Sequence, residues 1–342
     1  MIGVGVVGAG HAARIQLRGW GAVPNARVVG LWDRTPERGR ALADEFGVRC
    51  FEELDALVED PAVVAVDVAT ALETHLEHVR RAANARRHVL CQKPLAETYP
   101  AAEALVAACA AAGVRLMVNE NWRWRPWYRA IRGVIDGGSL GALFHLRLTF
   151  RKSMAVVTPD RPPERIFEHQ PFLRHMRPLV LLELGPHHLD VVRYLFGDPH
   201  TVYARTHKVT SVVDGEEVAT VLLGYPDRTA VVELSWASVG FPGEPNPDTL
   251  SLEGTDGTLR LTPEGAVNVI YRDGRRIDVP VDLDDAIQRS WTAALAHFAD
   301  AIERSGPFET DGSYGLATHR AVLAAYRSAA SGLPMPLVEG QP

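Results

Sequence analysis

The fold is decided by residues 2–13, which read Ile2-Gly3-Val4-Gly5-Val6-Val7-Gly8-Ala9-Gly10-His11-Ala12-Ala13. A β-branched run leads directly into a G-x-G-x-x-A motif that opens a segment of helical period. In such a strand–turn–helix, Gly8 permits the tight turn, Gly10 lets a pyrophosphate approach the backbone, and Ala13 allows close helix–strand packing. The helix N-terminus supplies free N–H groups and a positive dipole for the anion. We therefore predict a dinucleotide site that includes Gly8, Gly10, His11 and Ala13. The alternative is a glycine-rich turn that binds nothing.

The choice of dinucleotide rests on the next strand. Asp33 ends it, 20 residues after Ala13, where an acidic side chain can accept hydrogen bonds from an adenosine ribose. Asp33 would repel a 2′-phosphate, whereas the adjacent Arg34 could attract one. This pair favours NAD and leaves NADP possible. The alternative for Asp33 is a solvated acid at the start of a helix.

The pattern of strand-like and helical segments changes once along the chain. Up to residue 120, strand-like and helical segments alternate, which predicts an N-terminal Rossmann domain with a doubly wound parallel sheet over residues 1–120. Residues 121–342 predict an α+β domain with an open, mainly antiparallel sheet, an initial helix at 122–135, and two closing helices that pack back. The predicted strands lie at 2–7, 27–32, 63–69, 88–91, 115–118, 143–150, 202–209, 218–225, 229–237, 250–253, 258–261, 266–271 and 276–281.

Composition excludes several classes of protein. The 342 residues carry 36 basic and 42 acidic side chains, a net charge of -6, without a block of like charges. A nucleic-acid or anionic-membrane binder would show such a block. Every apolar run is short or interrupted, as Asp67 interrupts 63–70, so no membrane span is expected. Met1 leads straight into a strand, which predicts a cytoplasmic protein. The three cysteines form neither a disulfide framework nor a zinc pattern, and no metal site is expected.

Two clusters carry candidate catalytic groups. Lys93, one of only three lysines, follows the strand at 88–91, and the carboxyl ends of strands face the ligand crevice of a doubly wound sheet. The second cluster opens a helix at Pro186. There His187 shares a helix face with Asp190, and Glu183 lies close enough to orient its ring. The alternatives are a solvated loop lysine and ordinary capping histidines.

These residues resemble the Gfo/Idh/MocA family, the glucose–fructose oxidoreductase and inositol 2-dehydrogenase-like enzymes. Gly8-x-Gly10-x-x-Ala13 occurs in the family's order and spacing together with Thr74-His75, Gln92-Lys93-Pro94 and Gly185-x-His187-x-x-Asp190. The resemblance implies the two-domain fold, NAD(P)-dependent oxidation of a sugar, cyclic polyol or related hydroxy compound, and a homodimer or homotetramer assembled through the open sheet.

The resemblance also implies residue roles. Lys93 and His187 stand where the family has its catalytic lysine and histidine, and Glu183 stands where an aspartate is usual. Gln92 replaces the commoner glutamate, so Lys93 lacks that neighbouring charge. The Pro-Asn common after Thr70 is Ala71-Leu72 here, which puts that loop's cofactor contacts in doubt. The implied cofactor contacts in this part of the chain are Thr70, His75, Gln92 and Lys93.

The substrate is expected at residues that combine stacking with hydrogen bonding. Aromatic faces cover the C–H patches of a sugar, while arginine and asparagine bind its hydroxyls. The candidates are Asn119, Trp122, Arg123, Arg151 and Asp190, with the Pro- and Arg-rich stretch 152–178 as a covering lid. The alternatives are a hinge helix with core tryptophans, and arginines that only pair with acids.

Three functions remain open from the sequence. The first is a sugar or polyol dehydrogenase. The second is an NAD-dependent glycoside hydrolase or epimerase on the same fold, and the third is a non-catalytic, cofactor-bound regulator. Lys93 and His187 count against the third because a regulator would not need them.

Overall fold

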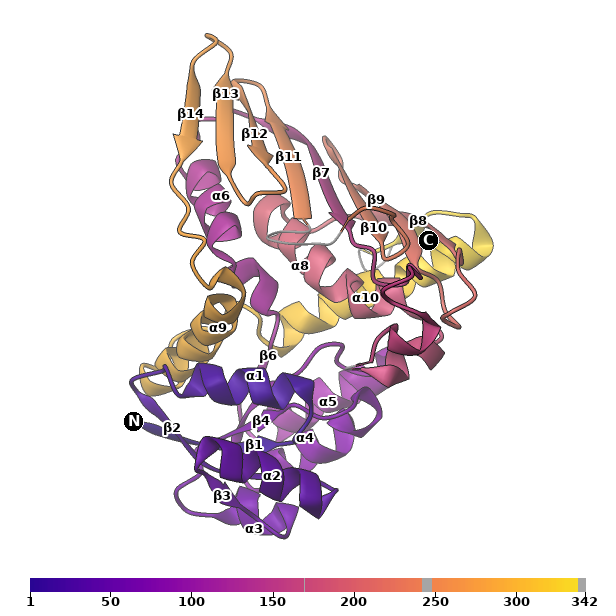
Figure 1. Cartoon of the computed structure of the whole chain (residues 1–342). Coiled ribbons are helices and arrows are strands. Elements are labelled where there is room, and N and C mark those ends of the chain that lie inside the picture. The colour runs from indigo at the N-terminus through magenta and orange to yellow at the C-terminus, as the bar shows by residue number, and fades with distance from the viewer. Residues whose placement is uncertain (169, 242–247, 338–342) are drawn as a thin grey trace. The chain divides into compact units, whose positions relative to one another are not determined.

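The computed structural model describes residues 1–168, 170–241 and 248–337, shown in Figure 1. The chain forms two compact units. The first contains residues 1–124 together with 287–319, and the second contains residues 125–286 together with 320–342. The series of βα repeats at the N-terminus therefore shares its unit with a segment near the C-terminus. This division differs from a single boundary at residue 120.

The first unit is built on a parallel sheet. Its six strands lie in the order β3-β2-β1-β4-β5-β6. The chain adds β2 and β3 on one side of β1 and then β4, β5 and β6 on the other side, as in a Rossmann fold. All of its strand pairs are parallel, so the predicted doubly wound sheet is confirmed. The strands are β1 (Ile2–Val7), β2 (Ala26–Trp32), β3 (Arg49–Cys50), β4 (Ala65–Val68), β5 (His88–Cys91) and β6 (Leu116–Val118).

Helices cover both faces of this sheet, which explains why its strands are apolar on both sides. The helices of the first unit are α1 (His11–Trp20), α2 (Pro36–Phe46), α3 (Leu54–Glu59), α4 (His75–Asn84), α5 (Tyr99–Ala111) and α9 (Ala286–Glu303), with short 3₁₀ turns η1 (Leu72–Thr74) and η2 (Asn121–Trp124).

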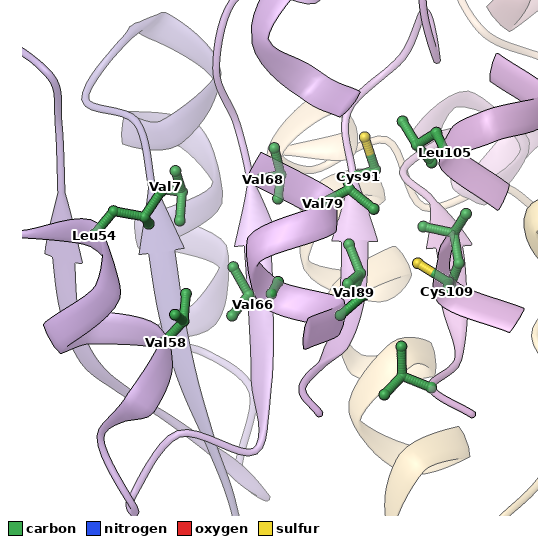
Figure 2. Packing of buried hydrophobic residues seen from close by; sticks show 14 of the residues in the cluster. Val7, Leu54, Val58, Val66, Val68, Val79, Val89, Cys91, Leu105 and Cys109 are labelled. Atoms are coloured by element: carbon green, nitrogen blue, oxygen red, sulfur yellow. The ribbon is translucent and has the colours of Figure 1, made fainter. Parts of the chain in front are cut away.

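Alternation along the strands separates two hydrophobic cores. One core packs β4 and β5 against α3, α4 and α5, through residues such as Val66, Val89 and Cys91 (Figure 2). The other core packs the opposite face against α1, α2 and α9, and Trp20 of α1 meets Phe298 of α9 there with ring centroids 6.3 Å apart. Each core is closed, so the sheet positions its loops at the carboxyl edge with little freedom.

The second unit contains a mixed, mostly antiparallel sheet. Within the described residues its order is β14-β13-β12-β11-β7-β10-β9-β8-β15, and only β7 and β10 pair in parallel. The strands are β7 (Leu143–Arg151), β8 (Thr201–His207), β9 (Val218–Gly224), β10 (Thr229–Ser235), β11 (Asp248–Gly254), β12 (Gly257–Leu261), β13 (Val267–Tyr271), β14 (Arg276–Val279) and β15 (Met335–Pro336).

One face of this sheet is covered and the other is open. The helix α8 packs on β7 and β10, α7 on β9 and α6 on β13. Along β9 every second residue is buried, and the residues between them, which point to the opposite face, are part-exposed or exposed; Leu222 is 42% exposed. The elements on the covered side are α6 (Pro126–Asp136), α7 (Val180–Glu183) and α8 (Gly185–Phe196); the unit also contains η3 (Pro163–Arg165) and η4 (Pro171–His175), and α10 (Gly312–Ser331) runs from the first unit into the second.

One local expectation is corrected. The helix expected over 122–135 is interrupted, because Arg125 is extended (φ −60°, ψ 138°) and α6 begins afresh at Pro126. A residue before proline avoids the helical region for steric reasons. The stretch 152–178, apart from residue 169, contains η3, η4 and buried residues such as Ile166 and Leu173. Among the described residues, no helix is long and apolar enough to cross a membrane.

Candidate functional site

The turn between β1 and α1 has the backbone expected of a phosphate cradle. Gly8 has φ +112°, and a Cβ there would lie 2.6 Å from the carbonyl oxygen of Ala69, so only glycine fits. Gly10 is the N-cap of α1 and makes no side-chain capping bond, and a helix N-terminus of this kind attracts an anion through its N–H groups and its dipole. A Cβ on Gly10 would meet nothing closer than Arg38 Nη2 at 3.8 Å. Ala13 is fully buried against the sheet, and His11 is exposed at the start of α1.

Asp33 is fixed beside this turn. Its Oδ2 accepts a hydrogen bond from the backbone N–H of Ala9 at 2.7 Å, and its Oδ1 accepts one from Thr35 N–H at 2.8 Å. Each carboxylate oxygen retains a further lone pair for a ribose hydroxyl. Arg34 lies next to it in the chain and is exposed. The geometry places a negative charge at the end of β2, as the sequence predicts.

The loops after β4 and β5 are joined by His75. This residue is 1% exposed, and its Nδ1 lies 3.0 Å from the carbonyl oxygen of Pro94 while its Nε2 lies 3.1 Å from that of Thr70. Burial lowers the pKa of His75, with the facing carbonyls opposing the shift. In this arrangement the imidazole connects two loops of the candidate site. Its role as a direct cofactor contact stays a prediction.

The hydroxyl of Thr70 belongs to a small network that the sequence reasoning missed. Thr74 Oγ1 donates to Thr70 Oγ1 at 2.9 Å, and Thr70 Oγ1 lies 3.1 Å from Nδ1 of His78. The signal in the sequence was the i, i+4 spacing of Thr70, Thr74 and His78, which brings such side chains together on a helical turn.

Lys93 begins the loop after β5. Its side chain is half-buried, and its backbone N–H donates to Oε1 of the preceding Gln92 at 3.1 Å. Asn119 lies beside this loop, because its backbone N–H donates to the carbonyl of Cys91 at 2.8 Å. The Asn119 amide is fully buried, and neither Oδ1 nor Nδ2 has a hydrogen-bond partner among the described residues. Such a group costs about 1–3 kcal/mol unless a ligand satisfies it.

These observations test whether the first unit suits a nicotinamide dinucleotide. The open glycine turn can receive the pyrophosphate, Asp33 can receive the ribose, and the unsatisfied Asn119 amide stands at the carboxyl edge of the sheet. These residue types and the open glycine turn suit a dinucleotide.

Arginine and tryptophan after Asn119 have partners of their own. The Arg123 guanidinium donates to the backbone carbonyl of Glu309 at 3.3 Å and lies 4.5 Å from the ring centroid of Tyr314. Trp122 is half-buried in the same 3₁₀ turn. Substrate binding by Trp122 and Arg123 stays a prediction.

The second unit carries the histidine cluster. Glu183 is the last residue of α7, and α8 begins two residues later at Gly185 with Pro186 in its first turn. His187 is 6% exposed and Asp190 is fully buried, both on α8. The roles of these three residues stay predictions.

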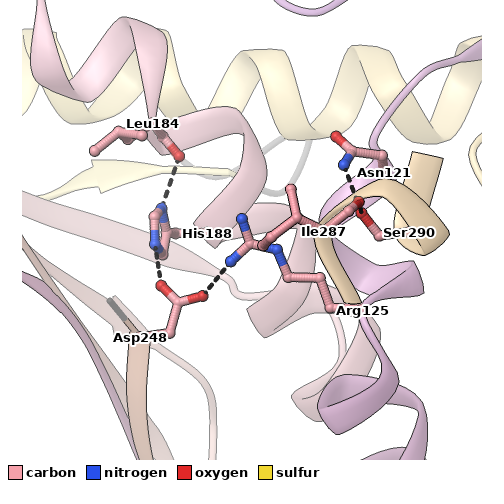
Figure 3. A network of polar contacts seen from close by, with 7 residues as sticks. All are labelled: Asn121, Arg125, Leu184, His188, Asp248, Ile287 and Ser290. Atoms are coloured by element: carbon pink, nitrogen blue, oxygen red, sulfur yellow. Dashed lines mark hydrogen bonds and ion pairs between the residues drawn. The ribbon is translucent and has the colours of Figure 1, made fainter. Parts of the chain in front are cut away.

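A buried ion-pair network, shown in Figure 3, anchors the start of α8. His188 Nε2 lies 3.1 Å from Asp248 Oδ1, and its Nδ1 lies 2.9 Å from the carbonyl of Leu184. Arg125 Nη1 donates to Asp248 Oδ2 at 2.7 Å. Although burial opposes ionisation, the His188 hydrogen bond and the Arg125 charge hold the pKa of Asp248 below its usual range. No local signal in the sequence indicates this network, which fixes the helix that carries His187.

Several arginines of the second unit, Arg151 among them, lie close to acidic side chains. Arg147 Nε donates to Glu233 at 2.8 Å, and Arg151 Nη2 lies 3.9 Å from the same carboxylate. Arg177 lies 3.5 Å from Asp214. These pairs match the simpler of the two interpretations offered by the sequence, and substrate binding by Arg151 stays a prediction.

Comparison with known proteins decides the family. Residues 2–120 match the model of the oxidoreductase family with an NAD-binding Rossmann fold, and residues 128–260 match the GFO/IDH/MocA C-terminal domain. A D-apiose dehydrogenase of Rhizobium rhizogenes is 34% identical over 338 residues, covering 96% of this chain and 95% of that protein. The chain belongs to the GFO/IDH/MocA family. A second D-apiose dehydrogenase, from Paraburkholderia graminis, is 36% identical and covers 96% of this chain and 87% of that protein.

Solved structures of the GFO/IDH/MocA fold agree. An oxidoreductase of Agrobacterium radiobacter, crystallised with NAD+, L-tartaric acid and magnesium, superposes with a TM-score of 0.90 at 32% identity over 98% of both chains. A levoglucosan dehydrogenase in complex with NADH and levoglucosan has the same fold, with a TM-score of 0.83 at 21% identity over 99% of both chains. The protein is thus an oxidoreductase with an NAD-binding Rossmann domain, as the sequence motifs predict.

Proposed function

We propose that the protein is an NAD-dependent dehydrogenase that oxidises a hydroxyl group of a free sugar, with D-apiose the first candidate. The observation that carries the proposal is Lys93, held at the carboxyl end of β5 beside the unsatisfied Asn119 amide. Two relatives that cover nearly the whole chain, both D-apiose dehydrogenases, support the choice of substrate. NAD, when bound, supplies the hydride acceptor.

Three residues of the chain are assigned separate roles in moving the hydroxyl proton and stabilising the charge that develops. In the proposal His187 is the general base that takes the hydroxyl proton, and Glu183 orients its ring. The Lys93 ammonium donates a hydrogen bond to the oxygen on which negative charge develops. Removing one such donor typically costs about a hundredfold to a thousandfold in kcat.

The first experiment follows NADH formation spectroscopically with D-apiose, other aldoses and cyclic polyols, each with NAD and NADP. Lys93→Met is expected to lower kcat by about a hundredfold or more while NAD binding persists. Lys208→Met is the matched control, because Lys208 Nζ donates to the carbonyl of Thr210 in a loop of the second unit. Wild-type turnover in Lys93→Met would end the proposed role.

Two other outcomes identify the rival functions. Consumption of a glycoside or interconversion of epimers without accumulation of NADH would identify a hydrolase or epimerase. Cofactor and sugar binding without turnover of any substrate would identify a regulator.

The preference for NAD is assigned to Asp33. Asp33→Ser removes the acceptor beside Ala9 and the charge that repels a 2′-phosphate. We expect NAD affinity to fall about tenfold, as for loss of a charge-assisted hydrogen bond, with a smaller loss for NADP. Unchanged affinity for both cofactors would show that Asp33 does not bind the ribose.

The open sheet face of the second unit is the proposed surface for a homodimer or homotetramer. It presents Leu222, 42% exposed, among alternating part-exposed residues of β8, β9 and β10. Leu222→Glu is expected to lower the oligomer size in analytical ultracentrifugation. An unchanged mass would assign assembly elsewhere. The cytoplasmic location and the covering role of residues 152–178 stay predictions.

A further inference from the structure

One acidic side chain is buried inside the parallel sheet of the first unit. Asp67 lies in the middle of β4, and its exposure is zero. Its neighbours Val66 and Val68 point to the core shared with α3, α4 and α5, so Asp67 points to the opposite face, toward α1. The same alternation on β5 places Val89 and Cys91 with the first core and Leu90 with the second. Gln92, the next even position, continues onto the α1 side.

A hydrogen-bonded chain runs from this carboxyl group to the Lys93 loop. Gln16 Nε2 donates to Asp67 Oδ1 at 2.7 Å, and Gln92 Nε2 donates to Gln16 Oε1 at 3.3 Å. Gln92 Oε1 then accepts the backbone N–H of Lys93 at 3.1 Å. Asp67 Oδ2 is occupied by Trp20 Nε1–H at 2.8 Å. Gln16 is fully buried and Gln92 is 4% exposed, so water offers these amides little competition.

We propose that Asp67 is a positioning residue, whose buried carboxyl group orients the Gln16 and Gln92 amides so that Gln92 holds the backbone of Lys93. The proposal rests on the function proposed for Lys93. It also accounts for Gln92 in a place where the family usually has glutamate. Here the acidic group is Asp67, which is linked to Gln92 by two successive hydrogen bonds through Gln16.

The hydrogen-bonded series from Asp67 to Lys93 runs in one donor-to-acceptor direction, and the Asp67 carboxylate determines that direction. A primary amide has a donor end and an acceptor end, so the orientation of one amide determines that of the next. When Asp67 is ionised, both of its oxygens accept, so Gln16 must turn its NH₂ toward Asp67 and its carbonyl toward Gln92. Gln92 must then turn its NH₂ toward Gln16, which leaves its carbonyl for Lys93 N–H.

The substitution Asp67→Asn would reverse this order with almost no change of volume. Trp20 N–H can only donate, so the carbonyl of the new amide would face Trp20 and its NH₂ would face Gln16. Gln16 and Gln92 would both turn over, and the NH₂ of Gln92 would meet the N–H of Lys93. The bond to Lys93 would be lost.

A second substitution should repair the reversed chain. Glutamate at position 92 accepts with both oxygens, so it can receive the reversed Gln16 NH₂ and still accept Lys93 N–H. In Gln92→Glu alone, two acceptors compete for the single NH₂ of Gln16, so that variant should also be impaired. The double variant Asp67→Asn/Gln92→Glu also keeps the net charge of the wild type.

The test is this double-mutant cycle, measured above about pH 7 so that Asp67 is ionised, and read first by hydrogen exchange of the Lys93 amide in the NAD-bound protein. Exchange is expected to accelerate about two- to tenfold in each single variant, the equivalent of one lost hydrogen bond, and to return toward the wild-type rate in the double variant. In parallel, kcat should fall about tenfold in Asp67→Asn with little change in NAD affinity, and should recover to within about threefold in the double variant.

Trp20→Phe is the matched control. It removes the other donor to Asp67 without touching the chain to Lys93, so its thermal midpoint should fall while Lys93 exchange and kcat stay near wild type. Wild-type exchange at Lys93 in Asp67→Asn, or impairments that multiply in the double variant, would overturn the proposal. If a single variant does not fold, the double variant against wild type still decides, because an additive defect would prevent it from folding too.

The two readouts separate this inference from the proposed function. Exchange of the Lys93 amide needs no substrate. If the wild type oxidises no sugar but the exchange cycle behaves as expected, the dehydrogenase proposal fails and the positioning chain stands. If Lys93→Met abolishes sugar oxidation but the Lys93 amide exchanges at the wild-type rate in every variant of the cycle, the positioning role of Asp67 is wrong and the proposed dehydrogenase function stands.

Discussion

Asp67 of the first unit and Asp248 of the second are both fully buried, and they differ in their partners. Asp67 in the parallel sheet meets the neutral donors of Gln16 and Trp20, whereas Asp248 in the mixed sheet meets Arg125 and His188. Burial raises the pKa of Asp67 from 3.8 to about 7, with the two neutral hydrogen bonds opposing it. The pKa of Asp248 lies below its usual range despite burial. Charged partners, and not burial alone, decide which carboxyl group stays ionised.

The largest effect is expected from removing the Asp248 charge. Asp248→Asn leaves Arg125 buried without its carboxylate partner, and breaking a buried pair from one side typically costs about 3–5 kcal/mol. Urea unfolding at neutral pH measures this loss. A loss below about 1 kcal/mol would mean that the charged partners do not distinguish Asp248 from Asp67.

The next effect is the opposite pH dependence at Asp67. Its folded pKa is raised, so the stability it contributes is full below its unfolded pKa near 4 and is lost as pH rises to about 7. The neighbouring titratable group, the Cys91 thiol, stays neutral in this range because burial raises its pKa further. Between pH 5 and 8 the stability of Asp67→Asn relative to wild type should rise by about 2 kcal/mol. A difference independent of pH would contradict the raised pKa.

For Asp248 the sign is reversed. Its folded pKa is depressed, so its contribution is present above the unfolded value near 4 and is lost as pH falls through the folded pKa. Unfolding free energies of wild type and Asp248→Asn should therefore converge in acid. Curves that stay parallel down to about pH 3 would remove the contrast.

The smallest effect is expected at a surface carboxylate. Asp55 lies 3.0 Å from Arg81, with side chains 62% and 44% exposed. Exposed pairs contribute about 0–1 kcal/mol, so Asp55→Asn should cost less than about 1 kcal/mol, and less again in high salt. A loss as large as that of Asp248→Asn would show that burial is not what makes the Asp248 pair strong.

Local chemistry explains what could be predicted from the sequence. Gly8 and Gly10 signal a backbone that only glycine allows, and the hydrophobic period signals the alternation of strands and helices. The fold class and the cofactor therefore follow from short windows. The parallel pairing of β7 with β10 does not, because periodicity contains no information on strand direction.

Pairs of residues far apart in the sequence could not be predicted, for a related reason. Arg125 and Asp248 are separated by 123 residues, and His188 and Asp248 by 60, so no local pattern joins them. Asp67 was visible only as an acid inside an apolar run. Its partners Gln16 and Trp20 lie on α1, and only the packing of α1 on that face of the sheet brings them to Asp67.

The return of residues 287–319 to the first unit has a consequence for synthesis on the ribosome. Leu295 and Phe298 of α9 complete the core around Trp20, yet they are translated after the whole of residues 125–286. During synthesis, part of one face of the parallel sheet therefore stays uncovered until almost the entire chain has emerged from the ribosome. A fragment that ends at residue 124 lacks α9 and should accordingly aggregate more readily than the full chain.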